Sequence, residues 1–236
     1  MKRPGAVFTI ALALGAIILA PRVGAQAQDS RKEGPTEIDK CQTISQSGSY
    51  KLVNNLTFNG PSGSACLSIT ANFITIDLAG FTITGTSPSG GPSLAFPMAI
   101  EAGDNTTGIT VRNGSISGNF NDGVVLSGDG SIVEGLQVSN ASALGITARG
   151  IVRGNTAVGN FVGIDADGLI TGNYVSGAQS GIVAAGSVIG NTVTNSQRGI
   201  VVGCPSNVTD NTATGNSVVN LLLNGNGCNN TNNVAP

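Results

Sequence analysis

The chain has 236 residues, of which only 10% are charged, and it contains neither His nor Trp. A chain of this length accommodates one sizeable hydrophobic core. The lack of His excludes Ser-His and Cys-His nucleophiles and any metal site that uses His. The net charge of −2 disfavours nucleic-acid binding, because that binding depends on clustered Lys and Arg.

Residues 1–27 are typical of a secretory signal peptide. Lys2 and Arg3 form a short positive start, residues 7–20 are apolar apart from one Thr, and Ala25-Gln26-Ala27 is a small-x-small cleavage site. This apolar run is shorter than the roughly 20 residues that a membrane-spanning helix needs. We therefore predict cleavage, no membrane insertion afterwards, and a secreted or periplasmic (extracytoplasmic) location.

After cleavage, residues 28–40 form a charged linker, and residues 41–236 are predicted to be one domain. Without residues 1–27, 8 basic residues face 13 acidic ones, which gives a net charge of −5. Four cysteines in an exported chain suggest disulfides. They allow three pairings, and we prefer Cys41–Cys66 with Cys204–Cys228 because each pair spans about one repeat. Zinc is disfavoured because no Cys-x-x-Cys occurs and His is absent.

The repeat is clearest in three blocks of 18 residues. They read GITARGIVRGNTAVGNFV (145–162), GIDADGLITGNYVSGAQS (163–180) and GIVAAGSVIGNTVTNSQR (181–198). Looser copies occupy 67–85, 99–119, 122–140, 199–219 and 220–230, and a Gly/Pro/Ser-rich insertion lies at 86–97. Repetition at about twenty residues predicts a solenoid.

Each block contains three short apolar pieces, too short for helix pairs, which predicts three β-strands per turn and an all-β parallel β-solenoid of about eight turns. Equivalent residues of successive turns lie about 4.8 Å apart, so columns of residues are the unit of packing. The predicted inward columns are Ile146/Ile164/Ile182/Ile200, Ala148/Ala166/Ala184/Val202, Val152/Ile170/Val188 and Ala157/Val175/Val193/Ala213.

Gly and Asn mark the corners between strands. The recurring positions are Gly145, Gly163, Gly181 and Gly199, with Asn155, Asn173, Asn191 and Asn211. Both residue types tolerate positive φ, which we expect at these corners. Stacked Asn side chains also form hydrogen bonds from turn to turn, so a structural ladder is preferred to a binding role.

The handedness of the solenoid depends on which column is apolar. A left-handed hexapeptide helix requires apolar residues six apart, and Ile146, Val152, Val158, Ile164 and Ile170 satisfy this spacing. Continued further, the same column meets Ser176 and Thr194, whereas the Ala157/Val175/Val193 column stays apolar. We therefore prefer a right-handed parallel β-helix and keep the left-handed β-helix as the alternative.

The stretches CQTISQSGSYKLVNNLTF and CLSITANFITIDLAGFTITG resemble the opening of secreted right-handed parallel β-helix proteins of the pectate-lyase-like superfamily. The resemblance covers about residues 41–230. It implies an association with carbohydrate, but the group includes lyases, hydrolases, esterases, epimerases and adhesins. Its pectate lyases carry acidic calcium ligands on one sheet face with a nearby Arg as base.

The corresponding outward positions of the first strand in each turn are mostly uncharged. They read Ser68, Glu101, Val125, Thr147, Asp165, Val183 and Val201. Glu101 and Asp165 are three turns apart, about 14 Å at the strand spacing, which is too far to share an ion or one glycosidic bond. Aromatic residues that could stack on sugars are scarce, leaving Phe81, Phe96, Phe120 and Phe161, some of which we expect in the core.

The best local set of polar residues is Arg149, Asp165 and Asp167. The two carboxylates could contribute to a Ca²⁺ site, the only cofactor the sequence suggests, but such a site needs six to eight oxygens. Arg149 is expected directly beside Asp167 in the preceding turn, where a surface ion pair is the simpler interpretation. A second column, Asp77, Arg112, Glu134 and Arg153, alternates in sign and is expected to help set the register.

These observations predict an exported protein that binds polysaccharide or has a structural role, as a monomer or in end-to-end assemblies. The candidate ligand-binding residues are Glu101, Arg149, Asp165 and Asp167, and no catalytic residue or metal ligand is assigned. Enzymes of this type need long loops to wall a cleft, and this chain has one modest insertion. The alternatives are a polysaccharide lyase or glycosidase that uses the acidic residues of the first sheet face, and an adhesin or assembly module.

Overall fold

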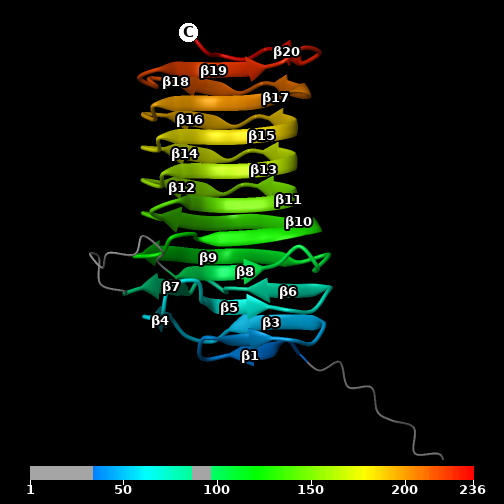
Figure 1. Cartoon of the computed structure of the whole chain (residues 1–236), viewed down its shortest axis with the longest axis vertical. Coiled ribbons are helices and arrows are strands. Elements are labelled where there is room, and N and C mark those ends of the chain that lie inside the picture. Colours follow the sequence, from blue (N-terminus) through cyan, green and yellow to red (C-terminus); the bar gives the residue numbers. More distant parts are fainter. Residues whose placement is uncertain (1–33, 87–96) are drawn as a thin grey trace, which may run out of the picture. The chain divides into compact units, whose positions relative to one another are not determined.

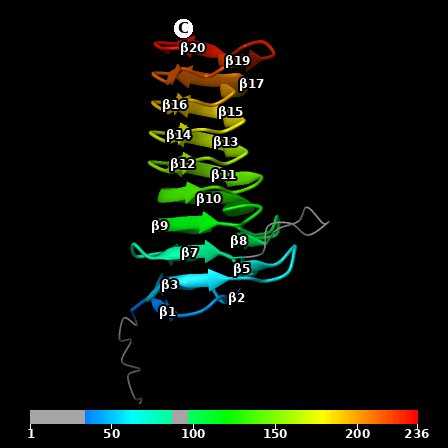
Figure 2. The same ribbon diagram turned by 90° about the vertical axis from the view of Figure 1, so that its left-hand side faces the viewer.

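The computed structural model describes residues 34–86 and 97–236, and every regular element in these residues is a β-strand. The strands pair in parallel with the equivalent strand of the next turn, so these residues form a parallel β-solenoid whose turns follow one another in chain order (Figures 1 and 2). No helix in this part of the chain is long and apolar enough to cross a membrane. The predicted signal peptide, and residues 87–96 of the insertion, lie outside the described residues.

The strands stack in three columns, and several long strands bend at a corner and contribute to more than one column. The first column contains β2 (Gln42–Ile44), β5 (Ala65–Ile69), β8 (Met98–Ala102), the starts of β10 (Val124–Ser139), β11 (Leu144–Arg153), β13 (Val162–Thr171), β15 (Ser180–Ile189) and β17 (Arg198–Thr209), and β19 (Val219–Asn224). The second contains β1 (Thr36–Ile38), β3 (Gly48–Leu52), β6 (Ile74–Asp77), the start of β9 (Thr110–Gly118), later parts of β10, β11, β13, β15 and β17, and β20 (Asn229–Thr231).

The third column contains β4 (Leu56–Phe58), β7 (Thr82–Gly85), the ends of β9 and β10, β12 (Thr156–Val158), β14 (Tyr174–Ser176), β16 (Thr192–Thr194) and β18 (Thr212–Thr214). Figure 2 shows β12, β14 and β16 of this column one above another. A single bridge from Thr212 to Val234 continues the column into the last turn.

The predicted inward columns form the core. Ile146, Ile164, Ile182 and Ile200 are completely buried, and the other three predicted columns are also buried. In the third column Ala157 is buried while its neighbour Val158 is 39% exposed. The preference for a right-handed solenoid rests on this choice of apolar column, and the column itself is confirmed.

The predicted Asn ladder is present. The side-chain amides of Asn155, Asn173 and Asn191 each donate to Oδ1 of the equivalent Asn in the next turn, at 3.0, 2.9 and 3.0 Å. Asn211 continues the series by donating to Asn233 at 2.9 Å. Each rung also donates to a backbone carbonyl of the preceding turn, so these buried amides join consecutive turns.

The expectation of positive φ at these Gly and Asn positions is wrong. The ladder residues do not have positive φ; the residue before each of them does, as Gly172 (φ 63°) shows before Asn173. Gly163 does not have positive φ either. It is required by close approach, because an added Cβ would lie 2.3 Å from Val175 Cγ1 and 2.6 Å from the carbonyl oxygen of Gly181.

The solenoid begins earlier than the predicted boundary at residue 41. β1 pairs with β3 in the second column, and its Ile38 is completely buried. The last residues of the predicted linker 28–40 therefore belong to the solenoid. β1 was not predicted from the sequence because it is three residues long and places a single apolar side chain in the core.

Both preferred disulfides are present, and they confirm the pairing that was chosen among the three. Cys41 bonds to Cys66, and Cys204 bonds to Cys228, closing sequence separations of 25 and 24 residues. The first precedes β2 and joins it to β5, and the second joins β17 to the segment before β20. The two bridges therefore lie in early and late turns of the described solenoid, where a turn lacks stacked neighbours on one side.

Candidate functional site

The outward face of the first column has the predicted register. Glu101 on β8 pairs with Ser68 and Val125, and Asp165 on β13 pairs with Thr147 and Val183. Three strand-to-strand steps separate the two acids, about 14 Å at the usual spacing. Glycosidase carboxyl groups lie roughly 5–9.5 Å apart, so the first column does not bring Glu101 and Asp165 to one bond.

Asp165 and Asp167 lie two residues apart on β13. Partial burial, and secondly the charge of Asp167, raise the pKa of the Asp165 carboxyl above its usual range. Beside it, the Thr147 hydroxyl oxygen is buried without a hydrogen-bond partner. The described residues contain no cluster of three or more Asp, Glu, Cys or His that could hold a metal ion. With Val183 on the other side, this pair does not offer the six to eight oxygens of a Ca²⁺ site.

The expected ion pair between Arg149 and Asp167 is not formed. Their backbones are in register, as predicted, but neither side chain makes an ion pair or a hydrogen bond with a described residue. Both are exposed on the strand surface. The attraction between exposed charges is about 0–1 kcal/mol, which does not repay the entropy of holding two long side chains in one geometry.

The predicted column of alternating charges is confirmed and is longer than expected. Backbone pairing places Glu37, Lys51, Asp77, Arg112, Glu134 and Arg153 in successive turns of the second column, and we call these six residues the charge stripe. Two ion pairs form within it, Arg112–Asp77 at 3.1 Å and Arg153–Glu134 at 2.5 Å. Four of its six charges are neutralised in this way, which supports the predicted role of the column in setting the register.

Glu101, one of the four candidate ligand-binding residues, lines a hollow. A concavity of about 320 Å³ opens beside β8 and is lined by Ser68, Thr70, Glu101, Asn105 and Thr106, with Ile69 and Gly103. We call the five residues with polar side chains the Glu101 notch. Arg149, Asp165 and Asp167 lie turns away and do not contribute to it.

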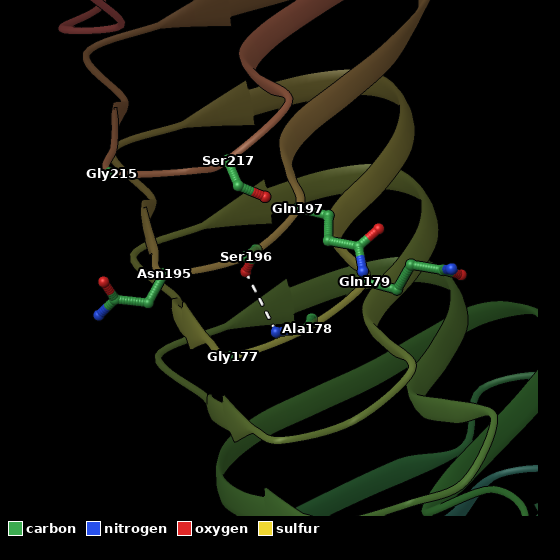
Figure 3. A pocket seen from close by; sticks show the side chains of 8 residues that line it. All are labelled: Gly177, Ala178, Gln179, Asn195, Ser196, Gln197, Gly215 and Ser217. Atoms are coloured by element: carbon green, nitrogen blue, oxygen red, sulfur yellow. Dashed lines mark hydrogen bonds between the residues drawn. The ribbon is translucent and has the colours of Figure 1, made fainter.

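A second concavity, of about 460 Å³, lies at the corner between the third column and the first (Figure 3). It spans three turns, and its lining includes Gln179, Asn195, Gln197 and Ser217, which we call the corner groove. Figure 3 shows Gln197 above Gln179, with Asn195 on the opposite side. The corner recurs because each turn leaves a third-column strand, passes a short loop and enters the next first-column strand.

The side chains of the corner groove are not used by the fold. Gln179, Asn195, Gln197 and Ser217 are all exposed and make no side-chain hydrogen bond within the described protein. Ser196 at the same corner is different: its hydroxyl accepts from the Ala178 backbone N–H at 3.2 Å and is buried. The corner therefore separates buried structural groups from exposed groups that remain available to a ligand.

An exposed aromatic residue occupies the equivalent corner of the preceding turn. The backbone N–H of Gln179 donates to the carbonyl oxygen of Phe161 at 2.9 Å, so Phe161 occupies the equivalent corner below Gln179. Phe161 is 51% exposed, whereas Phe120 is buried. The expectation that some of the candidate Phe residues pack in the core is thus met by Phe120, while Phe96 lies outside the described residues.

The corner groove was not predicted from the sequence. The recurrence of Gln at 179 and 197 in the 18-residue blocks was the available signal, but Gln at a corner is equally common as a solvated residue. Only the structure shows that these side chains have no partner and border a concavity.

No protein-family model and no curated protein matches this chain. Among solved structures, the enzymatically active domain of tailspike protein 2 of bacteriophage CBA120 is similar at 17% sequence identity with a TM-score of 0.39. The match covers 80% of this chain and 42% of that chain, so this chain spans less than half the length of that protein.

Proposed function

We propose that this chain is an exported protein that binds a neutral polysaccharide in the corner groove and does not cleave it. The observation that carries the proposal is the set of four exposed polar side chains, without partners, around one concavity. Amide and hydroxyl groups both donate and accept hydrogen bonds, as sugar hydroxyls do. None of the described residues that line the groove is charged, which favours an uncharged ligand.

The spacing of the groove also suits a polymer. Successive corners repeat at about 4.8 Å, close to the rise per sugar of an extended pyranose chain, so each turn can contact one sugar. Phe161 provides an apolar surface on the adjacent turn for the flat face of a sugar ring. The sequence resemblance to pectate-lyase-like proteins supports a carbohydrate ligand, and the two disulfides together with the leader support export.

Binding without cleavage is preferred because none of the described residues that line the corner groove carries a carboxyl group. Hydrolysis needs two carboxyl groups at one glycosidic bond, and a lyase needs a base near a group that stabilises the enolate. Asp165 and Asp167 lie two residues apart on β13, but neither lines the corner groove, and Glu101 is three turns away from Asp165.

The proposal is tested with the mature protein on an array of neutral and acidic glycans, followed by reducing-end and unsaturated-uronate assays. We expect binding to neutral glycans and no product. The double variant Gln179→Ala/Gln197→Ala should weaken binding of the best ligand by about thirtyfold, since each of the two lost hydrogen bonds is worth about 1 kcal/mol. Gln137→Ala is the matched control, because Gln137 is also exposed and makes no side-chain hydrogen bond. Turnover of any glycan, or no effect of the double variant, would contradict the proposal.

A further inference from the structure

The Glu101 notch contains a carboxylate without a counter-charge. Glu101 forms neither an ion pair nor a hydrogen bond with any described residue, and its column neighbours are Ser68 and Val125. This distinguishes it from Asp77 and Glu134 of the charge stripe, each of which faces an Arg. A carboxylate in a hollow and without a cation is available to a ligand that brings one.

Around Glu101, the notch offers further polar groups that the fold leaves free. The Ser68 hydroxyl and the Asn105 amide make no side-chain hydrogen bond within the described protein. Ser68 is directly beside Glu101 in the preceding turn, and Asn105 lies in the loop that follows β8. Together they present donors and acceptors suited to ligand hydroxyls beside one negative charge.

The rim of the notch is held in place from both neighbouring turns. The Thr107 backbone N–H donates to Asn72 Oδ1 at 2.9 Å, and the Thr107 hydroxyl donates to the carbonyl oxygen of Asp129 at 3.0 Å. Gly128 packs so closely that an added Cβ would lie 1.7 Å from the Thr106 carbonyl oxygen. A fixed rim reduces the ordering cost that a ligand must overcome.

An exposed aromatic ring borders the same loop. Phe73 is 68% exposed, and its backbone N–H donates to the Thr107 carbonyl oxygen at 2.9 Å. Its ring packs on Gly108, where an added Cβ would lie 2.8 Å from Phe73 Cδ1. Phe73 also has a positive φ of 56°, an unusual conformation for an aromatic residue, and it holds the ring in solvent rather than in the core.

We infer that the Glu101 notch binds a saccharide that carries a free ammonium group, that is, a deacetylated amino sugar. The ammonium would pair with the Glu101 carboxylate, the hydroxyls of the same unit would meet Ser68 and Asn105, and a neighbouring unit would lie on Phe73. Acidic sugars are disfavoured because Glu101 repels a uronate. The notch shares no residue with the corner groove, so the two binding proposals can be tested and rejected independently.

The test uses calorimetry with the mature chain at constant ionic strength. The probes are glucosamine and N-acetylglucosamine oligomers of equal length, which differ in the ammonium group. We expect the glucosamine oligomer to bind at least about tenfold more tightly, the usual effect of a hydrogen bond to a charged group. Glu101→Gln should remove this preference while leaving the melting temperature unchanged, and Phe73→Ala should weaken both oligomers.

Glu37→Gln is the matched control, because it removes the same charge from an exposed position on β1. If Glu37→Gln weakens binding of the glucosamine oligomer as much as Glu101→Gln does, the inference is overturned. The oligomer would then be attracted only by the net negative charge of the protein. Equal affinity for the two oligomers would also overturn it. An oligolysine peptide that binds as tightly as the glucosamine oligomer, and depends equally on Glu101, would assign the notch to peptide amines instead.

Discussion

The side-chain amide of Asn173 donates both to Oδ1 of Asn191 in the next turn, at 2.9 Å, and to the carbonyl oxygen of Val152 in the preceding turn, also at 2.9 Å. Its own Oδ1 accepts the backbone and side-chain N–H groups of Asn155, each at 3.0 Å. One buried amide thus satisfies polar groups of three consecutive turns. A core made of aliphatic columns alone would leave these corner groups without partners.

Asn173→Ala should therefore destabilise the protein far more than an ordinary Asn substitution. The change leaves two N–H groups of Asn155 and the carbonyl of Val152 without partners, which should lower the free energy of unfolding by about 2–4 kcal/mol. Urea denaturation measures this value. Asn226→Ala is the control, since Asn226 is exposed and makes no hydrogen bond with a described residue. It should change the free energy of unfolding by less than about 0.5 kcal/mol. Similar losses in the two variants would contradict a structural role for the ladder.

Reversing the charge of one residue of the charge stripe should lower the stability of the protein. Arg112→Glu places three acids in consecutive turns and should cost about 1–2 kcal/mol at low salt, because like charges in adjacent strands repel. The penalty should shrink as salt rises. Asp77→Arg with Glu134→Arg in the same chain should recover part of it. Arg198→Glu, at an exposed Arg without an ion pair, is the control and should be nearly neutral. An unchanged denaturation midpoint for Arg112→Glu would show that the stripe does not contribute to stability.

From the raised pKa of Asp165 we expect an unusual dependence of stability on pH. The pKa of Asp165 is higher in the folded protein than in the unfolded chain, so folding favours the protonated carboxyl group. The resulting contribution to the free energy of unfolding is fully present below the unfolded-state pKa. It is lost as the pH rises through the folded-state pKa. Asp165→Asn should thus raise the melting temperature slightly at pH 7 and have little effect below about pH 3.8, near the ordinary pKa. Asp167→Asn should lower the pKa of Asp165, because it removes a neighbouring negative charge. Carboxyl-carbon NMR titration measures both values, and an Asp165 pKa that does not respond to Asp167→Asn would contradict this assignment.

The disulfides predict local as well as global effects. Each closes a loop of about 25 residues, and loss of either should cost about 3 kcal/mol in the chain-entropy account. Replacing Cys204 and Cys228 by Ala should increase hydrogen exchange in β19 and β20 while β13 and β15 remain protected. A uniform increase across all turns would indicate that the bridge does not act as a local clamp.

The parts of the fold that depend on columns were predictable from the sequence. Stacking brings identical positions of the repeat together, so the burial of Ile164, the pairing of Arg112 with Asp77 and the Asn173 rung all follow from aligning the blocks. The preferred disulfides follow from the same alignment. β1 was missed because a strand of three residues with one buried side chain has no periodicity to detect.

Side-chain behaviour at the surface was not predictable in the same way. Register placed Arg149 beside Asp167, but whether two exposed charges meet depends on rotamers and solvent, and here they do not. Gly172, and not Asn173, has positive φ. The side-chain amide of Asn173 points inward, where it reaches its hydrogen-bond partners. Glu101 became a distinct candidate only when the loop after β8 was seen to form a hollow beside it.

A neutral polysaccharide bound in the corner groove would contact the side-chain amides of Gln179, Asn195 and Gln197. The most direct measurement is NMR titration of the isotope-labelled mature protein with the best neutral glycan from the array, observing backbone and side-chain amide signals. We predict that the largest shifts occur at the side-chain amides of Gln179, Asn195 and Gln197 and at the backbone amide of Phe161, with little change around Glu101. Shifts confined to other surfaces, or no shift at saturating glycan, would contradict the account.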